Sequence, residues 1–335
     1  MNHILTIEGL RTTFRTYAGE VQAVRDVNIA VREGECLAVV GESGSGKSVT
    51  MLSVMRLLAS NARIEGRAVF NGVDLLSIPE REMRKIRGKD IAMVFQDPMT
   101  GLNPTLTVGL QLREGMMQHL GLSRAEADKR AIELLNLVGV PEPERRLKQY
   151  PHEFSGGMRQ RVMIAIALAC NPRLIIADEP TTALDVTIQA QILDLLKRLK
   201  KEFNTSIILI THNLGVVAGM ADRVVVMYGG RVAEVATVEE IFEQPRHPYT
   251  WALLRAVPRL DRKKDRRLES IAGSPPNMLQ PPPGCPFHPR CPYAMNVCAA
   301  EAPDMTPISP EHRAACWLLH PDAPPVDLSQ EVTEA

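Results

Sequence analysis

The chain has 335 residues, enough for about two domains. Its 39 Lys and Arg residues balance its 39 Asp and Glu residues, so its charge gives no reason to expect bulk binding to nucleic acid. No apolar run reaches the roughly 18 residues that a transmembrane helix needs. No signal peptide is visible at the N-terminus, so we expect a cytoplasmic protein, and its six Cys residues need an explanation other than disulfides.

Two alternating segments near the N-terminus predict half-exposed strands. Residues 4–10 and 23–31 alternate apolar and polar side chains, as a strand with one buried face does. Tyr17 lies between them and is a candidate for stacking on an adenine. An ordinary aromatic at a strand edge explains Tyr17 equally well from spacing alone.

A glycine-rich stretch follows, and the rest of the chain is organised around it. Residues 41–48 read GESGSGKS and fit the phosphate-loop pattern G-x-x-x-x-G-K-[ST]. The apolar residues 36–40 before it predict a buried strand, and residues 49–58 after it predict a helix. A chance glycine loop is the alternative, but this strand–loop–helix context disfavours it.

The loop composition suits a triphosphate with a magnesium ion. Glycines let successive backbone N–H groups surround a phosphate, and the helix N-terminus adds positive potential. Lys47 can reach the β- and γ-phosphates, while Ser48 can bind Mg²⁺. The predicted ATP and Mg²⁺ contacts are Gly41, Glu42, Ser43, Gly44, Ser45, Gly46, Lys47 and Ser48.

Polar side chains also stand at the ends of later apolar runs. They are Gln96 after residues 91–95, Asp178 and Glu179 at the end of residues 174–179, and His212 after residues 206–210. Asp178 can hold Mg²⁺ through water, and Glu179 can polarise the attacking water as a general base. Gln96 can touch Mg²⁺ or water, and His212 can reach a γ-phosphate. Taken singly, Gln96 could be a polar loop residue, the pair Asp178 and Glu179 could belong to a solvated turn, and His212 could be a structural histidine.

The middle of the chain predicts a helical insertion. Residues 107–140 show helical periodicity, and Pro141, Pro143 and Pro151 interrupt it. Ser155, Gly156 and Gly157 then open an apolar helix over residues 162–170. Ser155 is a candidate N-cap, and the helix start favours an anion. No nearby residue indicates where that anion would come from.

The remaining pattern predicts an α/β fold. Residues 71–72, Asn-Gly, predict a hairpin turn, and residues 224–232 predict a second hairpin. Helices are expected over residues 77–87 and 188–201, and a loop over residues 97–104. Strands alternating with helices favour a largely parallel sheet.

Together these segments resemble the nucleotide-binding subunits of ATP-binding cassette (ABC) transporters. The matches are residues 41–48 to Walker A, Gln96 to the Q-loop, Phe154 with Ser155, Gly156, Gly157 and Met158 to the family signature, residues 174–178 to Walker B, Glu179 to the catalytic carboxylate, Asp185 to the D-loop, and His212 to the switch histidine. Phe154 and Met158 stand where Leu and Gln are commoner, and Asn213 stands where Asp is frequent. The resemblance implies a P-loop NTPase cassette over residues 1–242, with a mostly parallel core, an antiparallel β subdomain and a helical subdomain at about 97–160.

The resemblance also implies a mechanism and partners. In this family two cassettes sandwich two ATP molecules, and the signature of one closes on the γ-phosphate held by the other. Hydrolysis then releases the closed dimer. We therefore expect a second ATPase subunit, in preference a paralogue, two transmembrane permease subunits and an extracytoplasmic peptide-binding protein. The expected location is peripheral, at the cytoplasmic face of the inner membrane, with no nucleic-acid partner.

The C-terminal residues 243–335 suggest the cargo. Residues 247–250, HPYT, followed by Ala252, Leu253 and Leu254, resemble the extension of oligopeptide/dipeptide importer ATPases. This implies that hydrolysis powers import of di- or oligopeptides. An importer ATPase for nickel or another small solute, and a soluble ABC ATPase outside transport, are the alternatives. The Pro-rich residues 274–284 are expected to be extended.

Four of the six cysteines gather in this extension. Cys285, Cys291, Cys298 and Cys316 are spaced C-x5-C-x6-C-x17-C, which contains no C-x2-C pair and is a poor match to a zinc ribbon. Four thiolates can hold a [4Fe–4S] cluster, and the resemblance implies one here. Zinc and free or redox-active thiols remain alternatives. Cys36 and Cys170 lie in apolar segments and are expected to be ordinary buried thiols.

Overall fold

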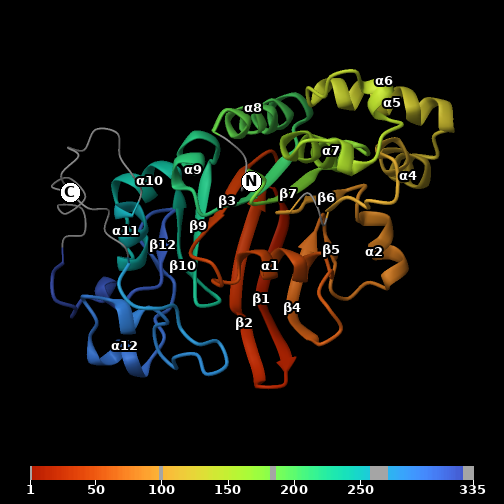
Figure 1. Cartoon of the computed structure of the whole chain (residues 1–335). Coiled ribbons are helices and arrows are strands. Elements are labelled where there is room, and N and C mark those ends of the chain that lie inside the picture. The colour runs from red at the N-terminus through yellow and green to blue at the C-terminus, as the bar shows by residue number, and fades with distance from the viewer. Residues whose placement is uncertain (1, 98–100, 182–185, 257–270, 327–335) are drawn as a thin grey trace. The chain divides into compact units, whose positions relative to one another are not determined.

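A computed structural model describes residues 2–97, 101–181, 186–256 and 271–326 (Figure 1). The chain forms two compact units that interleave along the sequence. The first unit comprises Met1–Ile4, Val31–Cys36 and Ser77–Ile210, and the second comprises Leu5–Ala30, Leu37–Leu76 and Thr211–Ala335. The predicted boundary between residues 242 and 243 follows neither unit and stays a prediction.

The first unit contains three parallel strands in the order β8-β7-β6. They are β6 (Ile91–Val94), β7 (Leu174–Asp178) and β8 (Ser206–Ile210). Every residue of β7 and β8 is buried, as expected for parallel strands covered on both faces. All three strands were predicted from the sequence, and their parallel pairing confirms the predicted parallel sheet.

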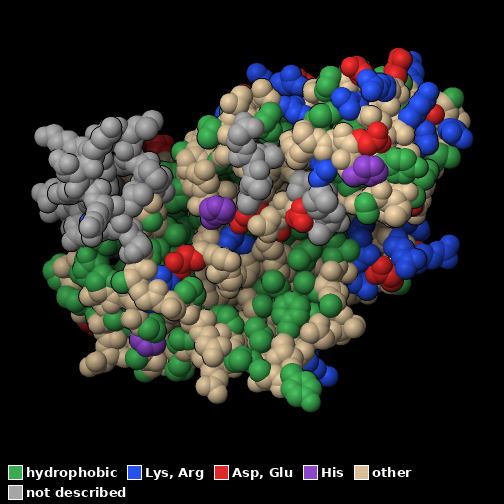
Figure 2. Space-filling model, viewed as in Figure 1, with side chains coloured by type: hydrophobic (Ala, Val, Ile, Leu, Met, Phe, Trp, Pro, Cys, Tyr) green, Lys and Arg blue, Asp and Glu red, His purple; other side chains and the backbone are tan. Residues whose placement is uncertain are grey.

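Helices make up most of the remainder of the first unit. They are α2 (Glu80–Ile86), α4 (Val108–Leu120), α5 (Arg124–Leu137), α6 (Pro143–Arg146), α7 (Gly156–Leu168) and α8 (Val186–Phe203). Helices α4, α5 and α7 pack against one another, and α4 and α5 lie within residues 107–140, where helices were predicted. Thr107 caps α4, and Ser123 and Glu126 form a capping box at α5. Lys and Arg side chains gather on the exposed surface of these helices (Figure 2).

The second unit contains an antiparallel sheet in the order β2-β1-β4-β5. Its strands are β1 (His3–Thr16), β2 (Gly19–Arg32), β4 (Ala62–Phe70) and β5 (Val73–Asp74), with the first residues of β1 and the last of β2 assigned to the first unit. Asn71 and Gly72 join β4 to β5 with φ of 47° and 83°, as a two-residue hairpin turn with both central residues left-handed requires. The predicted antiparallel strands and this turn are therefore confirmed.

A second set of strands in this unit combines the cassette with the C-terminal extension. β3 (Cys36–Val40) pairs in parallel with β9 (Arg223–Tyr228), which pairs antiparallel with β10 (Arg231–Thr237). β12 (Arg313–Ala314) then pairs with β10, and β11 (Thr306–Pro307) pairs with β12. The short strands β11 and β12 were not predicted, because two-residue strands carry no periodicity.

In the described residues of the second unit, five α-helices accompany these strands. They are α1 (Lys47–Val54), α9 (Leu214–Met220), α10 (Val238–Glu243), α11 (Pro248–Arg255) and α12 (Asn296–Ala300). Helix α1 ends earlier than the expected residue 58, because Arg56 adopts a left-handed φ of 52°. Residues 274–284 contain neither helix nor strand, as predicted.

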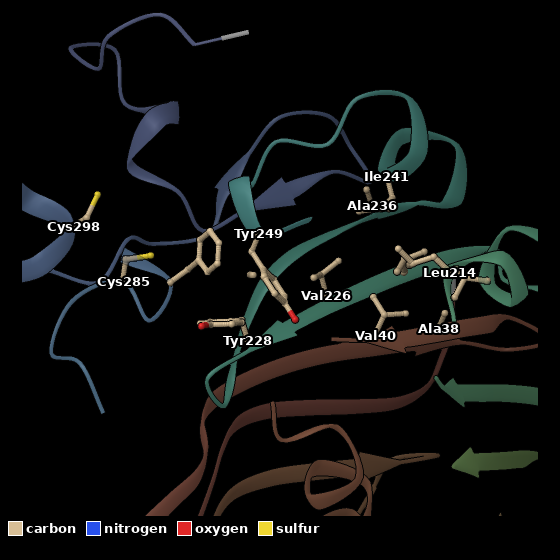
Figure 3. Packing of buried hydrophobic residues seen from close by; sticks show 14 residues of the cluster. Ala38, Val40, Leu214, Val226, Tyr228, Ala236, Ile241, Tyr249, Cys285 and Cys298 are labelled. Atoms are coloured by element: carbon tan, nitrogen blue, oxygen red, sulfur yellow. The ribbon is translucent and has the colours of Figure 1, made fainter. Parts of the chain in front are cut away.

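The core of the second unit is built jointly by strands and extension (Figure 3). Tyr228 on β9, Tyr249 on α11 and Phe287 form a buried ring cluster, with centroids 4.4 to 5.3 Å apart. Nearby, the fully buried Glu234 accepts hydrogen bonds from the backbone N–H of Arg246 and from Nε2 of His312. The extension is therefore part of this core. Among the residues that the structure describes, no helix is long and apolar enough to cross a membrane.

Candidate functional site

The phosphate loop joins β3 to α1 in the second unit, and its glycines are required by its shape. Gly41 has φ of 149°, and a Cβ atom there would lie 2.2 Å from the carbonyl oxygen of Met227. Gly46 has φ of 99° and caps α1, where a Cβ would lie 2.6 Å from the carbonyl oxygen of Ala23. The predicted strand–loop–helix arrangement is therefore present.

The ammonium group of Lys47 points into the loop. Lys47 Nζ donates hydrogen bonds to the carbonyl oxygens of Gly41 (2.8 Å) and Glu42 (2.9 Å). Ser43 and Gly44 are exposed at the tip of the loop, whereas Lys47 is buried and Ser48 half-buried at the start of α1. An ammonium held inside a glycine-rich loop at the start of a helix is an arrangement suited to a phosphate.

Glu42 has neighbours that the sequence analysis did not identify. Its backbone N–H donates to the Tyr249 hydroxyl at 2.7 Å, and its carboxylate accepts two hydrogen bonds from Arg290 at 2.6 and 3.0 Å. Tyr249 and Arg290 follow Glu42 by 207 and 248 residues, so no local sequence pattern links them to the loop. Burial raises the pKa of Tyr249 far above its ordinary value, so its hydroxyl stays neutral.

The first unit brings Gln96, Asp178 and Glu179 to one edge of its sheet. Strands β6 and β7 are parallel, with Val94 opposite Ala177, so the residues that follow them emerge at the same edge. Gln96 Nε2 donates to Glu179 Oε2 at 3.0 Å. Asp178 is buried at the last position of β7.

The backbone at Glu179 differs sharply from that of the strand before it. Glu179 has φ of 44°, in the left-handed region that residues other than glycine rarely adopt. Its N–H donates to the carbonyl oxygen of Ile210 at 2.9 Å, which holds it at the strand end. The backbone therefore leaves the extended conformation of β7 directly after Asp178.

The signature residues stand at the N-terminus of α7 in the same unit. Ser155 accepts a hydrogen bond from the N–H of Met158 at 3.3 Å, which confirms it as the N-cap. Ser155 and Gly156 are exposed, and Gly157 and Met158 are half-buried. A Cβ at Gly157 would lie 3.1 Å from Ile188 of α8, so a larger residue would press on that helix.

His212 belongs to the second unit and is exposed. The preceding Thr211 donates its N–H to the carbonyl oxygen of Val39 at 3.2 Å, which places His212 near the end of the strand that enters the phosphate loop. Asn213 caps α9, and its side chain accepts from the N–H of Gly215 at 2.9 Å. That cap is a structural use for Asn213 that the sequence analysis did not assign.

Two predicted site residues gain no structural support. Tyr17 lies in the turn between β1 and β2 and is fully exposed, so the strand-edge alternative is wrong and the adenine contact stays a prediction. Asp185 lies outside the described residues.

Burial and neighbouring thiols raise the pKa of cysteines in the extension. Burial, and then the neighbouring thiols, raise the pKa of Cys316 to about 12. Burial likewise raises the pKa of Cys291 to about 11, with contributions from Cys285 and Cys298. Cys36 and Cys170 are buried among apolar residues, as predicted.

The structure does not support the metal predictions. Among the described residues, no group of three or more His, Cys, Asp or Glu side chains could hold a metal ion. A zinc ion needs sulfur ligands at about 2.3 Å from one centre. The arrangement of the four cysteines therefore supports neither a zinc site nor an iron–sulfur cluster.

Comparison with known proteins defines the family. A family model described as "ABC transporter" matches residues 24–182, and one described as "Oligopeptide/dipeptide transporter, C-terminal region" matches residues 233–298. The chain is 54% identical over 334 residues to the oligopeptide transport ATP-binding protein OppD of Bacillus subtilis, covering 99% of this chain and 93% of that protein. It is 56% identical over 316 residues to OppD of Salmonella typhimurium, covering 94% of each.

Solved structures agree on the fold. A dimeric bacterial ABC transporter cassette has a TM-score of 0.64 and 31% identity, covering 70% of this chain and 98% of that one. A dimeric cassette in a post-hydrolysis state bound to ADP and Pi gives a TM-score of 0.64 with 30% identity and the same coverage. The predicted P-loop NTPase cassette fold is thereby confirmed, and the chain belongs to the oligopeptide and dipeptide transport ATP-binding proteins of the ABC transporter family.

Proposed function

We propose that this chain is the ATP-hydrolysing subunit that powers import of di- or oligopeptides through separate membrane subunits. The observation that carries the proposal is the pair of consecutive carboxylates at the end of β7, Asp178 and Glu179, with Gln96 hydrogen-bonded to Glu179. The same chain also folds a phosphate loop around Lys47. The peptide cargo rests on the extension that matches the oligopeptide/dipeptide model.

Each residue has a role in hydrolysis. The loop N–H groups and Lys47 bind the β- and γ-phosphates, so Lys47 exchanges its loop carbonyls for phosphate oxygens. Ser48, and Asp178 through water, would hold Mg²⁺, which when bound would offset negative charge on the phosphates. Glu179 accepts a proton from water as the water oxygen attacks the γ-phosphorus, and the bond to ADP breaks. His212 contacts the γ-phosphate, and Gln96 orients Glu179 or the water.

The exposed signature calls for a second cassette. Ser155 and Gly156 open a helix of 13 residues, and both are exposed to solvent. Such a terminus suits the γ-phosphate of ATP bound to a partner subunit. We infer that the partner is a paralogous ATPase and that the pair docks on two permease subunits at the cytoplasmic face of the membrane. An extracytoplasmic peptide-binding protein delivers the cargo.

We further propose that Cys285, Cys291, Cys298 and Cys316 hold a [4Fe–4S] cluster. A cluster spreads its thiolate ligands over four irons, so it needs no point that bonds three ligands at once. The backbone N–H of Cys285 donates to the carbonyl oxygen of Cys298 at 2.8 Å, and Cys285, Cys291 and Cys298 all contribute to the raised pKa of Cys316, which supports their proximity. Anaerobically purified protein is expected to absorb at about 400 nm and to contain iron and sulfide. Stoichiometric zinc, or neither metal, would contradict this assignment.

Uptake in cells tests the transport function. A strain lacking this chain is complemented with wild type or with Glu179→Gln, and uptake of labelled di- and oligopeptides is measured beside uptake of labelled nickel. Recovery of peptide uptake by wild type alone is the expected result. Recovery of nickel uptake alone would change the cargo. Co-purification with ribosomes or DNA in place of membrane subunits would overturn the transport role.

A further inference from the structure

Glu42, the second residue of the phosphate loop, is held through its carbonyl oxygen, its backbone N–H and its carboxylate. Its carbonyl oxygen accepts from Lys47, its N–H donates to Tyr249, and its carboxylate pairs with Arg290. Only the first of these partners belongs to the loop. We propose that Tyr249 and Arg290 of the C-terminal extension are positioning residues for the phosphate loop at Glu42, so that the extension sets the affinity for ATP. This inference rests on the proposed ATP-binding function.

Arg290 is a fixed anchor. Its side chain is only 4% exposed, and both terminal nitrogens contact the Glu42 carboxylate in a two-pronged pair. Nη1 also donates to the Tyr228 hydroxyl at 3.0 Å. Nε donates to the carbonyl oxygen of Ala272 at 2.9 Å, and Nη2 to that of Ile271 at 3.1 Å. A planar guanidinium with this many acceptors has a single orientation, and it transmits that orientation to Glu42.

Tyr249 supplies a second, independent contact. Its ring is fully buried between Tyr228 and Phe287, and Figure 3 shows its hydroxyl directed out of that ring cluster. The hydroxyl accepts the Glu42 N–H at 2.7 Å. Packing against Tyr228 and Phe287 fixes the position of the Tyr249 hydroxyl. The hydrogen bond from the Glu42 N–H to that hydroxyl then fixes the backbone at Glu42. Without the hydroxyl, that N–H would lose its partner.

These contacts affect ATP binding in two ways. First, a loop already held in shape loses less conformational freedom when it closes on phosphate. Second, a carboxylate in the phosphate loop repels the triphosphate unless its charge is offset, and the guanidinium of Arg290 offsets it. When Lys47 turns from the Glu42 carbonyl to phosphate, Arg290 and Tyr249 remain to hold that residue.

Nucleotide binding by the full chain tests the proposal. Affinity for a fluorescent ATP analogue with Mg²⁺ is measured for wild type, Arg290→Ala, Arg290→Lys and Tyr249→Phe. We expect roughly a tenfold rise in the Kd for the ATP analogue with Arg290→Ala, because the half-buried Glu42 carboxylate would lose the guanidinium that offsets its charge. Arg290→Lys should recover part of the loss, since it restores the charge without the fork. Tyr249→Phe should raise Kd by roughly threefold.

Ser309→Ala is the matched control. Ser309 ties the extension to α10 through Glu240 at 2.6 Å and does not contact the loop. The control should lower the melting temperature while leaving Kd unchanged. If Arg290→Ala behaves in the same way, the extension is a structural element only and the proposal is overturned.

A double mutant distinguishes a specific interaction between Glu42 and Arg290 from a general loss of structure. Glu42→Gln combined with Arg290→Ala should bind ATP no more weakly than Arg290→Ala alone, because both changes break one interaction. Fully additive losses would overturn the proposal. If Arg290→Ala does not fold, the same comparison is made with Glu42→Gln and Arg290→Lys, which change the same carboxylate–guanidinium pair. If wild type binds ATP and Lys47→Ala binds it much more weakly, the proposed ATP-binding function stands even where the positioning role fails.

Discussion

Glu179 combines a strained backbone with a hydrogen bond to Gln96. Its left-handed φ of 44° is unfavourable for a residue with a side chain, and it persists because the N–H is bonded to Ile210. Strain of this kind tends to occur at functional sites. The contact between Gln96 and Glu179 links a loop after β6 to the residue expected to activate water.

Glu179→Gln should retain ATP but hydrolyse it at least about a hundredfold more slowly, because the amide cannot accept the proton from water. Phosphate release and ATP affinity measured on the same preparation check this. The variant is also expected to accumulate as a nucleotide-bound dimer on size exclusion. Near-normal turnover would remove Glu179 from its role.

Lys47→Ala should weaken ATP binding itself. The ammonium is the charged group inside the loop, and charge-assisted contacts to phosphate are about twice as strong as neutral ones. A rise in Kd of roughly tenfold or more is expected. An unchanged affinity would show that the phosphates bind elsewhere.

At the scale of single elements, two capped helices allow stability and catalysis to be separated. Ser155 caps α7 at the signature, and Ser123, which is not a proposed nucleotide contact, caps α5. Each Ser→Ala change should lower the free energy of unfolding by about 1 kcal/mol. Only Ser155→Ala should also reduce ATP hydrolysis in the assembled dimer.

Urea unfolding and phosphate release measured on both variants check this prediction. Equal losses of activity from Ser155→Ala and Ser123→Ala would mean that the signature serine acts only through helix stability.

Regular elements were predictable from the sequence because their cause is local. The apolar runs at residues 36–40 and 206–210 coincide with β3 and β8, because a run with no polar position is buried on both faces. The Asn71–Gly72 turn was predictable because few residues accept two consecutive left-handed conformations. Helix ends were predicted less well, since Arg56 gives no sequence signal for its positive φ.

The missed features depend on tertiary contacts. β11 and β12 form only because β10 offers an edge to pair with, and two residues carry no pattern of their own. Glu42 appeared as a variable position of the phosphate loop, whereas the structure pairs it with Arg290. A single sequence contains no signal for a pair separated by 248 positions.

At the scale of the whole molecule, the extension is bound into the core of the second unit. Its strand β12 pairs with β10, and Tyr249 and Phe287 fill the same apolar cluster as residues of β3 and β9. His247 is buried there, and its Nδ1 accepts the N–H of Tyr249 at 3.0 Å. Burial lowers the pKa of His247 to about 4, and the nearby Glu234 opposes that shift.

This shift predicts acid sensitivity. The folded state holds His247 neutral down to pH about 4, whereas the unfolded chain binds the proton below about pH 6.5. The contribution of His247 to the free energy of unfolding is therefore full above pH 6.5 and is lost as the pH falls toward 4. At pH 5 the free energy of unfolding is lower by about 2 kcal/mol for this reason.

His247→Asn tests the acid sensitivity, because Asn retains an acceptor for the Tyr249 N–H without the titration. Denaturant unfolding at pH 7.5 and pH 5 should show wild type losing its advantage over the variant as the pH falls. A constant difference between the two proteins would contradict a buried neutral His247.

The central claim is that this chain carries two complementary half-sites, one at Lys47 and one at Ser155, and needs a second cassette to complete either. The most direct test is the rate of ATP hydrolysis per subunit against protein concentration, with the oligomeric state measured in the same samples and the paralogous ATPase added in a parallel series. We predict negligible hydrolysis by the monomer and a rate that rises with the dimer population. Full-speed hydrolysis by a strict monomer, unaffected by substitution of Ser155 or Gly156, would contradict the account.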